Sequence, residues 1–290
     1  MKTKTYLRTL LFVLLTTWIV GCETVVTEDI TLNGGEPRLV LDGGIERNTI
    51  SPLAEQQIRL SSTIGFLDTE DPTPITDAEV VVNDGDTDYE FAHVRNGIYS
   101  NSSIPTNLNA EYTITIVWNG ETYLGTDSLN EVVPFVGVYS EFEEETEFTE
   151  EGYFVKFDSQ DPEDEENFYY YRVFRNGEFV IVPDPGNGLT LVESDEFFNG
   201  QLRTGVNPNE EAVFELGDIA TAQQLGITND YFGYLVELFN QTGNQGLSFI
   251  GNPPPASIRG NMLNIDNPSN RALGYFYAVD VQEVTIEIIE

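Results

Sequence analysis

Four turn signals built on glycine divide much of this chain into short strand-like runs. The steps are Asn83-Asp84-Gly85, Asn96-Gly97, Asn119-Gly120 and Asn176-Gly177. Asn and Gly tolerate the positive φ angles of tight hairpin turns, so each step predicts a reversal between antiparallel strands. A chain that reverses this often is expected to be mainly β.

The runs between these turns support that expectation. Apolar side chains at positions 112, 114, 116 and 118 alternate with polar ones, which indicates a strand with one buried face. By the same criteria, strands are expected over residues 38–42, 57–61, 78–83, 89–94, 97–99, 111–118, 121–126, 136–141, 153–157, 168–175, 178–182, 272–279 and 283–289.

Helix signals occur only in the later part of the chain. Residues 216–225 are expected to form a short helix that ends at Gly226. Asn229 is a suitable cap for a second helix through residue 240, with Gly243 just past its end. Gly233 weakens this second helix, so a strand remains the alternative there.

The first 22 residues predict an export signal. Lys2, Lys4 and Arg8 precede a short apolar stretch at 10–20, and Gly21 precedes Cys22. The stretch is shorter than the roughly 20 apolar residues of a membrane-spanning helix, so cleavage after residue 21 and lipid attachment at Cys22 are expected. A retained anchor helix is the alternative.

The rest of the chain divides into three parts. Residues 22–36 lack helical or strand periodicity and are expected to be a flexible tether. Residues 37–134 are expected to form an N-terminal antiparallel β-sandwich, with a boundary near Pro134. Residues 135–290 are expected to form a second β-rich, sandwich-like domain that holds the short helices.

Charge excludes one class of partner. Residues 22–290 carry 10 Lys+Arg against 49 Asp+Glu, a formal net charge of −39. Such a surface repels phosphate backbones and anionic head groups, so nucleic-acid binding is not expected and membrane attachment must depend on the lipid. Seven glutamates within residues 141–151 are interpreted as a solvated loop or edge.

Few residues are available for catalysis or metal binding. Cys22 is the only cysteine and His93 the only histidine, so a thiolate or zinc site lacks further ligands. A Ser/His/Asp or Cys/His catalytic site would have to use His93, and nothing else in the sequence supports one. His93 is interpreted as a partly buried structural residue that shares a strand face with Tyr89 and Phe91. No cofactor is predicted.

An alternation of carboxylates at Asp84, Asp86 and Asp88 is a weak calcium candidate, because hard cations take several oxygens from one short segment. The glycine and glutamate that an EF-hand needs further along are replaced by Tyr89 and Arg95, so an acidic hairpin turn is the favoured interpretation. The carboxylates of residues 158–166 are a similar, unspaced cation candidate. The many acids also leave a carboxylate-pair glycan hydrolase as an alternative function.

Aromatic residues offer a candidate binding surface. Tyr169, Tyr171, Tyr275 and Tyr277 lie in two runs whose rings point to both faces of their strands. Exposed tyrosines stack on sugars or pack against partner proteins, so these four are speculative ligand-binding residues for a glycan or peptide. The alternative is packing in the core or at an edge.

Several short segments occur in an order that resembles a known family. They are the export signal, Ala78-Glu-Val-Val-Val82, Asn96-Gly-Ile-Tyr99, Tyr169-Tyr170, Ile258-x-Gly-Asn261 and Leu273-Gly-Tyr-Phe276. Together they resemble the lipoprotein family of Bacteroidota outer membranes catalogued as domain of unknown function four-two-four-nine. The resemblance covers nearly all of the chain after the signal.

The resemblance implies two β-rich domains, the first immunoglobulin-like or carboxypeptidase regulatory-like. It also implies a role beside TonB-dependent outer-membrane receptors, and it supplies no catalytic residues. In that lineage, acidic residues soon after the lipidated cysteine favour the cell surface. Here only Glu23 precedes the uncharged stretch 24–27, so the cell surface and the periplasmic face both remain open.

The hypothesis that follows is a lipid-anchored, non-enzymatic binding or accessory subunit of the outer membrane, which works with a TonB-dependent nutrient-uptake receptor. The alternatives are a carboxylate-based glycan hydrolase and a structural envelope adhesin.

Overall fold

The computed structural model describes residues 36–65, 71–146, 150–163, 165–180, 191–243 and 258–289. The predicted signal, Cys22 and nearly all of the predicted tether lie outside the described residues. The description below concerns the unit formed by residues 37–290.

The described chain is mainly β, as predicted, with one α-helix. Its elements are β1 Leu39–Asn48, β2 Gln56–Ser62, β3 Thr73–Pro74, β4 Glu79–Asn83, β5 Asp88–Arg95, β6 Ile98–Asn101, β7 Glu111–Trp118, β8 Glu121–Ser128, β9 Phe135–Glu143, β10 Gly152–Gln160, β11 Phe168–Arg175, β12 Glu178–Phe179, β13 Val192–Ser194, the 3-10 turn η2 Asp195–Phe197, β14 Leu202–Val206, β15 Ile219–Ile227, α2 Asn229–Gly243, β16 Leu263–Asn264 and β17 Leu273–Glu287.

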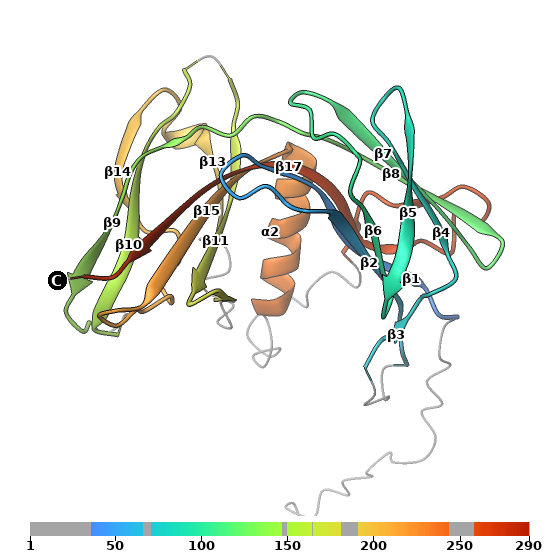
Figure 1. Ribbon diagram of the computed structural model, residues 1–290, viewed down its shortest axis with the longest axis horizontal. Coiled ribbons are helices and arrows are strands. Elements are labelled where there is room, and N and C mark those ends of the chain that lie inside the picture. The colour runs from blue at the N-terminus through green and yellow to red at the C-terminus, as the bar shows by residue number, and fades with distance from the viewer. Residues whose placement is uncertain are drawn as a thin grey trace, which may run out of the picture. The chain divides into compact units, whose positions relative to one another are not determined.

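The strands form two sheets. The larger has 14 strands in the order β12-β11-β15-β17-β1-β2-β6-β5-β4-β7-β8-β16, with β13 beside β11 and β3 beside β2. The smaller has the order β14-β10-β9. The longest strand, β17, lies between β1 and β15 and pairs with β1 in parallel (Figure 1). Residues far apart in the chain therefore meet along β17.

The Asn-Gly steps form the predicted hairpin turns. Asn96 and Gly97 have φ angles of 45° and 73°, and the steps at 119–120 and 176–177 have similar values. These turns join β5 to β6, β7 to β8 and β11 to β12. A local preference for positive φ is therefore enough to place three reversals.

A first apolar core lies between strands of the large sheet. Leu41 and Ile58 on one side, and Val80 and Ile114 on the other, belong to one buried cluster, and Phe276 of β17 joins them. The arrangement is sandwich-like, as predicted, but it includes a strand from the end of the chain. That residues 37–134 fold as an independent domain stays a prediction.

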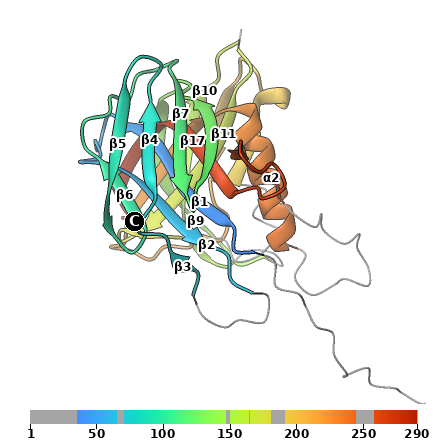
Figure 2. The ribbon, with the colours of Figure 1, turned by 90° about the vertical axis from the view of Figure 1, so that its right-hand side faces the viewer.

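A second sandwich-like arrangement forms where the small sheet, made of β9, β10 and β14, packs against β11 and β15 of the large sheet. Phe157 of β10 and Tyr171 of β11 have ring centroids 5.4 Å apart. The helix α2 packs against β11 and β17 through Tyr231 and Leu235, and Figure 2 shows it beside these strands. The predicted helix at 229–240 is confirmed, with three further residues at its C-terminal end.

Three predictions were wrong. Residues 219–227 form the strand β15 and not part of a helix, because Ala220, Ala222 and Gln224 are buried alternately between β11 and β17. The predicted strands at 272–279 and 283–289 are one continuous strand, β17. His93 is exposed, because it lies at the end of β5 beyond the buried Phe91.

Candidate functional site

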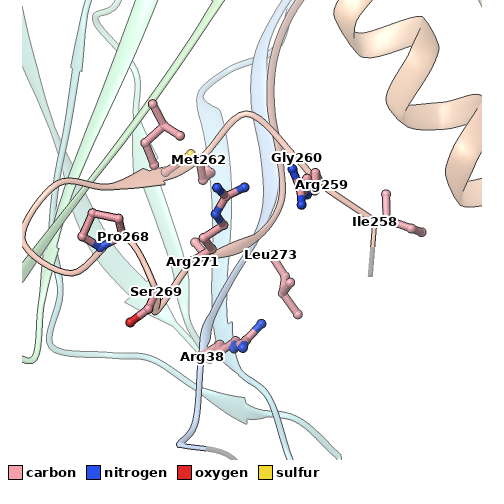
Figure 3. A pocket seen from close by; sticks show the side chains of 11 residues that line it. Arg38, Ile258, Arg259, Gly260, Met262, Pro268, Ser269, Arg271 and Leu273 are labelled. Atoms are coloured by element: carbon pink, nitrogen blue, oxygen red, sulfur yellow. The ribbon is translucent and has the colours of Figure 1, made fainter. Parts of the chain in front are cut away.

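A cleft of about 290 Å³ lies where the loop before β17 meets the start of β1 (Figure 3). We call it the arginine cleft. Its lining residues are Arg38, Ile258, Arg259, Gly260, Met262, Leu263, Pro268, Ser269, Arg271, Ala272 and Leu273.

The charge of this cleft is opposite to that of the protein. Residues 22–290 contain ten basic side chains, and four of them form ion pairs: Arg47, Lys156, Arg172 and Arg203. Three of the other six line this one cleft, and no lining residue is acidic. Among the described residues, no ion pair involves Arg38, Arg259 or Arg271. The cleft is therefore a cationic site on an acidic protein.

Two glycines allow the wall of the cleft to form. A Cβ on Gly260 would collide with the backbone oxygen of Gly274, and a Cβ on Gly274 would collide with that of Leu41. Gly274 also has a φ of 89°, which disfavours other residues. The loop at 258–262 can thus lie directly on β17, which in turn lies directly on β1.

Asn261 attaches the same loop to two strands. Its side-chain amide donates to the backbone oxygens of Thr126 and Phe276, at 2.9 and 2.7 Å, and its Oδ1 accepts from the Phe276 N–H at 2.9 Å. These contacts join the two segments, 258–261 and 273–276, that carry the family resemblance. Arg259 and Arg271 flank this junction.

A second anchor holds the loop between β16 and Arg271. The carboxylate of Glu121 accepts hydrogen bonds from Tyr123, Asn264 and Asn270, each at 2.8 Å, and from Asn267 at 3.1 Å. These bonds, with that from Tyr123 the strongest influence, lower the pKa of Glu121. The loop that carries Arg271 is therefore held in place without a ligand.

A second cleft, of about 480 Å³, has a partly buried ion pair at its wall. Its lining includes Gly44, Glu46, Glu55 and Tyr277. Arg172 donates to both carboxylate oxygens of Glu46, at 2.9 and 3.0 Å, and the Tyr277 hydroxyl donates to Oε1 at 3.0 Å. Burial raises the pKa of Glu46, but the charge and hydrogen bonds of Arg172 outweigh it and lower the pKa overall. Glu46 is thus held as a carboxylate.

The third candidate is the edge of the small sheet. Among the described strands, β9 pairs only with β10, so its other side has no strand partner. Three apolar side chains along β9 are exposed: Val136 by 63%, Tyr139 by 39% and Phe142 by 51%. An edge strand with exposed apolar residues is a template for pairing with another chain. We call this surface the β9 edge.

The four predicted tyrosines lie mostly in the interior. Tyr169 and Tyr171 are each 1% exposed and Tyr275 is 6% exposed, so these three cannot form an exposed stacking platform. Tyr169 donates to Asp161 at 2.7 Å, and Tyr275 stacks on Tyr231 of α2 with ring centroids 4.7 Å apart. These three tyrosines therefore match the alternative interpretation, in which they pack in the core. Tyr277 alone lines a cleft.

The weak calcium candidate lies in the turn between β4 and β5. The Asp84 carboxylate accepts from the N–H groups of Asp86 and Thr87, and Asp88 accepts from the Asn83 side chain at 2.7 Å. These bonds lower the pKa of Asp84, with that from Thr87 the strongest influence. They are the contacts of an acidic hairpin turn. Within the described ranges, no group of three or more potential metal ligands converges.

The remaining acidic segments divide between surface and core. Glu141 and Glu143 form ion pairs with Lys156, each at 2.7 Å, on the edge strand where a solvated run was predicted. Asp161, from the 158–166 cation candidate, is buried and accepts from Gly200 N–H at 3.1 Å as well as from Tyr169.

No helix in the described part of the chain is long and apolar enough to cross a membrane.

The comparison with protein families identifies the chain. The model described as Domain of unknown function (DUF4249) matches residues 23–285, so the chain belongs to that family, as the resemblance indicated. No curated protein matches the chain in sequence.

Sequence analysis did not find the arginine cleft. Arg38 is separated from Arg259 and Arg271 by more than two hundred residues, and no local spacing connects them. One signal was available: basic residues are rare in this chain, and one of them, Arg259, lies within the motif segment 258–261, while Arg271 lies just before the segment 273–276.

Proposed function

We propose that the protein is a lipid-anchored, non-enzymatic accessory subunit of the outer membrane, which docks on a TonB-dependent nutrient-uptake receptor and presents a ligand to it. The anchor is the lipid expected on Cys22. The protein is proposed to act at the cell surface or the periplasmic face.

The observation that carries this proposal is the β9 edge. Val136, Tyr139 and Phe142 are exposed on a strand that has no described partner on one side. Natural proteins usually protect such an edge with charges or a covering loop, and Glu141 is the one acidic residue between the exposed aromatic rings. An accessory subunit uses an edge of this kind to add its strand to a partner.

The clefts favour binding over glycan hydrolysis. A hydrolase needs one carboxyl group with a raised pKa as its general acid. Glu46 lines the larger cleft, but its pKa is lowered and both of its oxygens are bonded to Arg172. Such a carboxylate stabilises the fold and is a poor proton donor.

A pull-down from detergent-solubilised outer membrane, with a tagged full-length chain, tests the proposal. The parent chain is expected to recover a receptor barrel, and Val136→Lys is expected to reduce recovery about tenfold or more, because a charge in an interface core is costly. Ile50→Lys is the matched control, since Ile50 is also 63% exposed but lies in the loop after β1. This control should leave recovery unchanged.

Two outcomes would count against the proposal. If the parent chain recovers no receptor under mild conditions, the accessory role fails; if both lysine variants recover the receptor equally well, the β9 edge is not the docking surface. Cys22→Ala tests the anchor separately, because the variant is expected to leave the membrane fraction. Adhesion loss with normal nutrient uptake in a deletion strain would support the adhesin alternative.

A further inference from the structure

We propose that the arginine cleft binds the phosphate group of a small phosphate ester or of a lipid head group. This inference rests on the proposed function, because it names the chemical class of the ligand that the subunit presents. It is carried by the arginine cleft, which is separate from the β9 edge.

Three arginines of the cleft form no ion pair among the described residues. Arg38, Arg259 and Arg271 come from three segments and line one cleft that has no acidic lining residue. Elsewhere, four of the basic side chains are paired with carboxylates. On a protein with 49 acidic residues, three arginines that form no ion pair with any described residue are available to an external anion.

The geometry of a phosphate suits a cleft with several guanidinium groups. One guanidinium satisfies a planar carboxylate through two parallel hydrogen bonds. A phosphate monoester has up to two negative charges and three terminal oxygens, so it can accept from several guanidinium groups at once. Three arginines around one small cleft therefore suit a phosphate better than a single carboxylate.

The cleft is preformed and has an apolar side. Gly260, Asn261 and the Glu121 hydrogen bonds hold two of its three segments in place, so little ordering is needed on binding. Met262, Leu263 and Leu273 supply apolar contact for the body of the ligand. A volume of about 290 Å³ suits a small ester or a head group.

The position of Arg38 is compatible with a lipid head group as the source of the phosphate. Arg38 follows the predicted tether at 22–36, which spans at most about 50 Å when fully extended. A cleft at this position lies within reach of the membrane surface if Cys22 carries lipid. The phosphate can therefore come from a soluble ester or from the head-group layer, and the experiment must separate these sources.

Titration calorimetry with the full chain in non-ionic detergent tests the inference. The probes are sn-glycerol 3-phosphate, dibutyroyl phosphatidic acid, citrate, and glycerol as the uncharged control, in about 0.15 M salt so that distant carboxylates are screened. Binding of either phosphate probe, and not of glycerol, is expected. Tighter binding of the first probe identifies a soluble ester, and tighter binding of the second identifies a head group.

Variants of the three arginines test whether the phosphate probes bind in the arginine cleft. Arg38→Gln, Arg259→Gln and Arg271→Gln are each expected to weaken phosphate binding about tenfold or more, because each removes charge-assisted hydrogen bonds. Arg271→Lys keeps the charge and is expected to retain part of the affinity. Arg95→Gln is the matched control, since Arg95 is also exposed but lies outside the cleft on β5, and it should bind as the parent does.

Three results would overturn the inference. They are no binding of either phosphate probe, an equal loss in the Arg95→Gln control, and tighter binding of citrate than of both phosphates. None of these results affects recovery of the receptor through the β9 edge. A failed phosphate assignment and a failed accessory role are therefore distinguishable.

Discussion

Arg172 and Arg271 are the same kind of side chain in two different settings. Arg172 is largely buried, with 17% of its side chain exposed, and donates to both oxygens of Glu46, while Arg271 is exposed at a cleft with no acidic lining residue. A buried charge must have a partner within the protein, because removal from water is costly. An exposed charge has no such requirement and can bind an external ligand. The comparison therefore separates arginines that stabilise the fold from arginines that can recognise an anion.

The largest expected effect comes from breaking the buried pair. Glu46→Ala leaves Arg172 charged and without its carboxylate. Because both side chains keep 17% of their surface exposed, we expect a loss of about 3 kcal/mol in the free energy of unfolding, at the lower end for a buried pair. Urea denaturation measures it. Glu141→Ala is the control, since Glu141 is 57% exposed and Lys156 keeps its second ion pair, with Glu143, so the change should cost less than about 1 kcal/mol. Equal losses in the two variants would contradict the distinction between buried and exposed pairs.

A buried carboxylate without a basic partner predicts a pH dependence. Burial raises the pKa of Asp127 to about 6, although Ala278 N–H and the Thr228 hydroxyl donate to it at 3.0 and 2.7 Å. The folded state therefore binds this proton more tightly than the unfolded state. Its stabilising effect is complete below the ordinary value near 4, and it is lost as the pH rises through 6.

Asp127→Asn isolates that effect. Asparagine can accept from Ala278 N–H and donate to the Thr228 oxygen, and it does not titrate. The difference in unfolding free energy between the parent and the variant should change by about 2–3 kcal/mol from pH 4 to pH 7, in favour of the variant at pH 7. Urea denaturation at several pH values checks this expectation. A difference that is constant with pH would show that Asp127 is not the responsible group.

The smallest expected effect is the stability change on removing a cleft arginine. Arg271→Ala should alter the free energy of unfolding by less than about 0.5 kcal/mol, because the side chain is exposed and lacks an ion-pair partner among the described residues. The same urea experiment measures it. A loss as large as that of Glu46→Ala would show that Arg271 stabilises the fold, and the contrast with Arg172 would fail.

Prediction from sequence succeeded where the signal was local. The Asn-Gly steps require positive φ angles whatever surrounds them, and the structure has those angles at all three. The helix α2 is also where it was predicted, but Thr228 and not Asn229 accepts from the N–H of Tyr231 at its start, and Gly243 is its last residue. The helix prediction for residues 216–225 was wrong because their composition is compatible with a helix. Only the tertiary structure shows that most of this segment is the strand β15, which pairs with β11 and β17.

The candidate sites depended on long-range contacts. Tyr169 and Tyr275 are aromatic residues on strands, and their sequence does not show which face a second layer covers; Phe198 covers one and Tyr231 the other. The arginine cleft requires β17 to pair with β1, so that residues 271–273 come beside Arg38. No local pattern contains that register.

The sequence by itself therefore determined the turns, the strand-rich class and the place of the helix, and it carries the expectation of lipid attachment at Cys22, because each depends on the φ preferences or the spacing of neighbouring residues. Tertiary structure alone decided the parallel pairing of β17 with β1, the burial of three predicted tyrosines and the meeting of three arginines at one cleft. These features depend on which distant surfaces exclude water from one another, and a linear pattern does not carry that information.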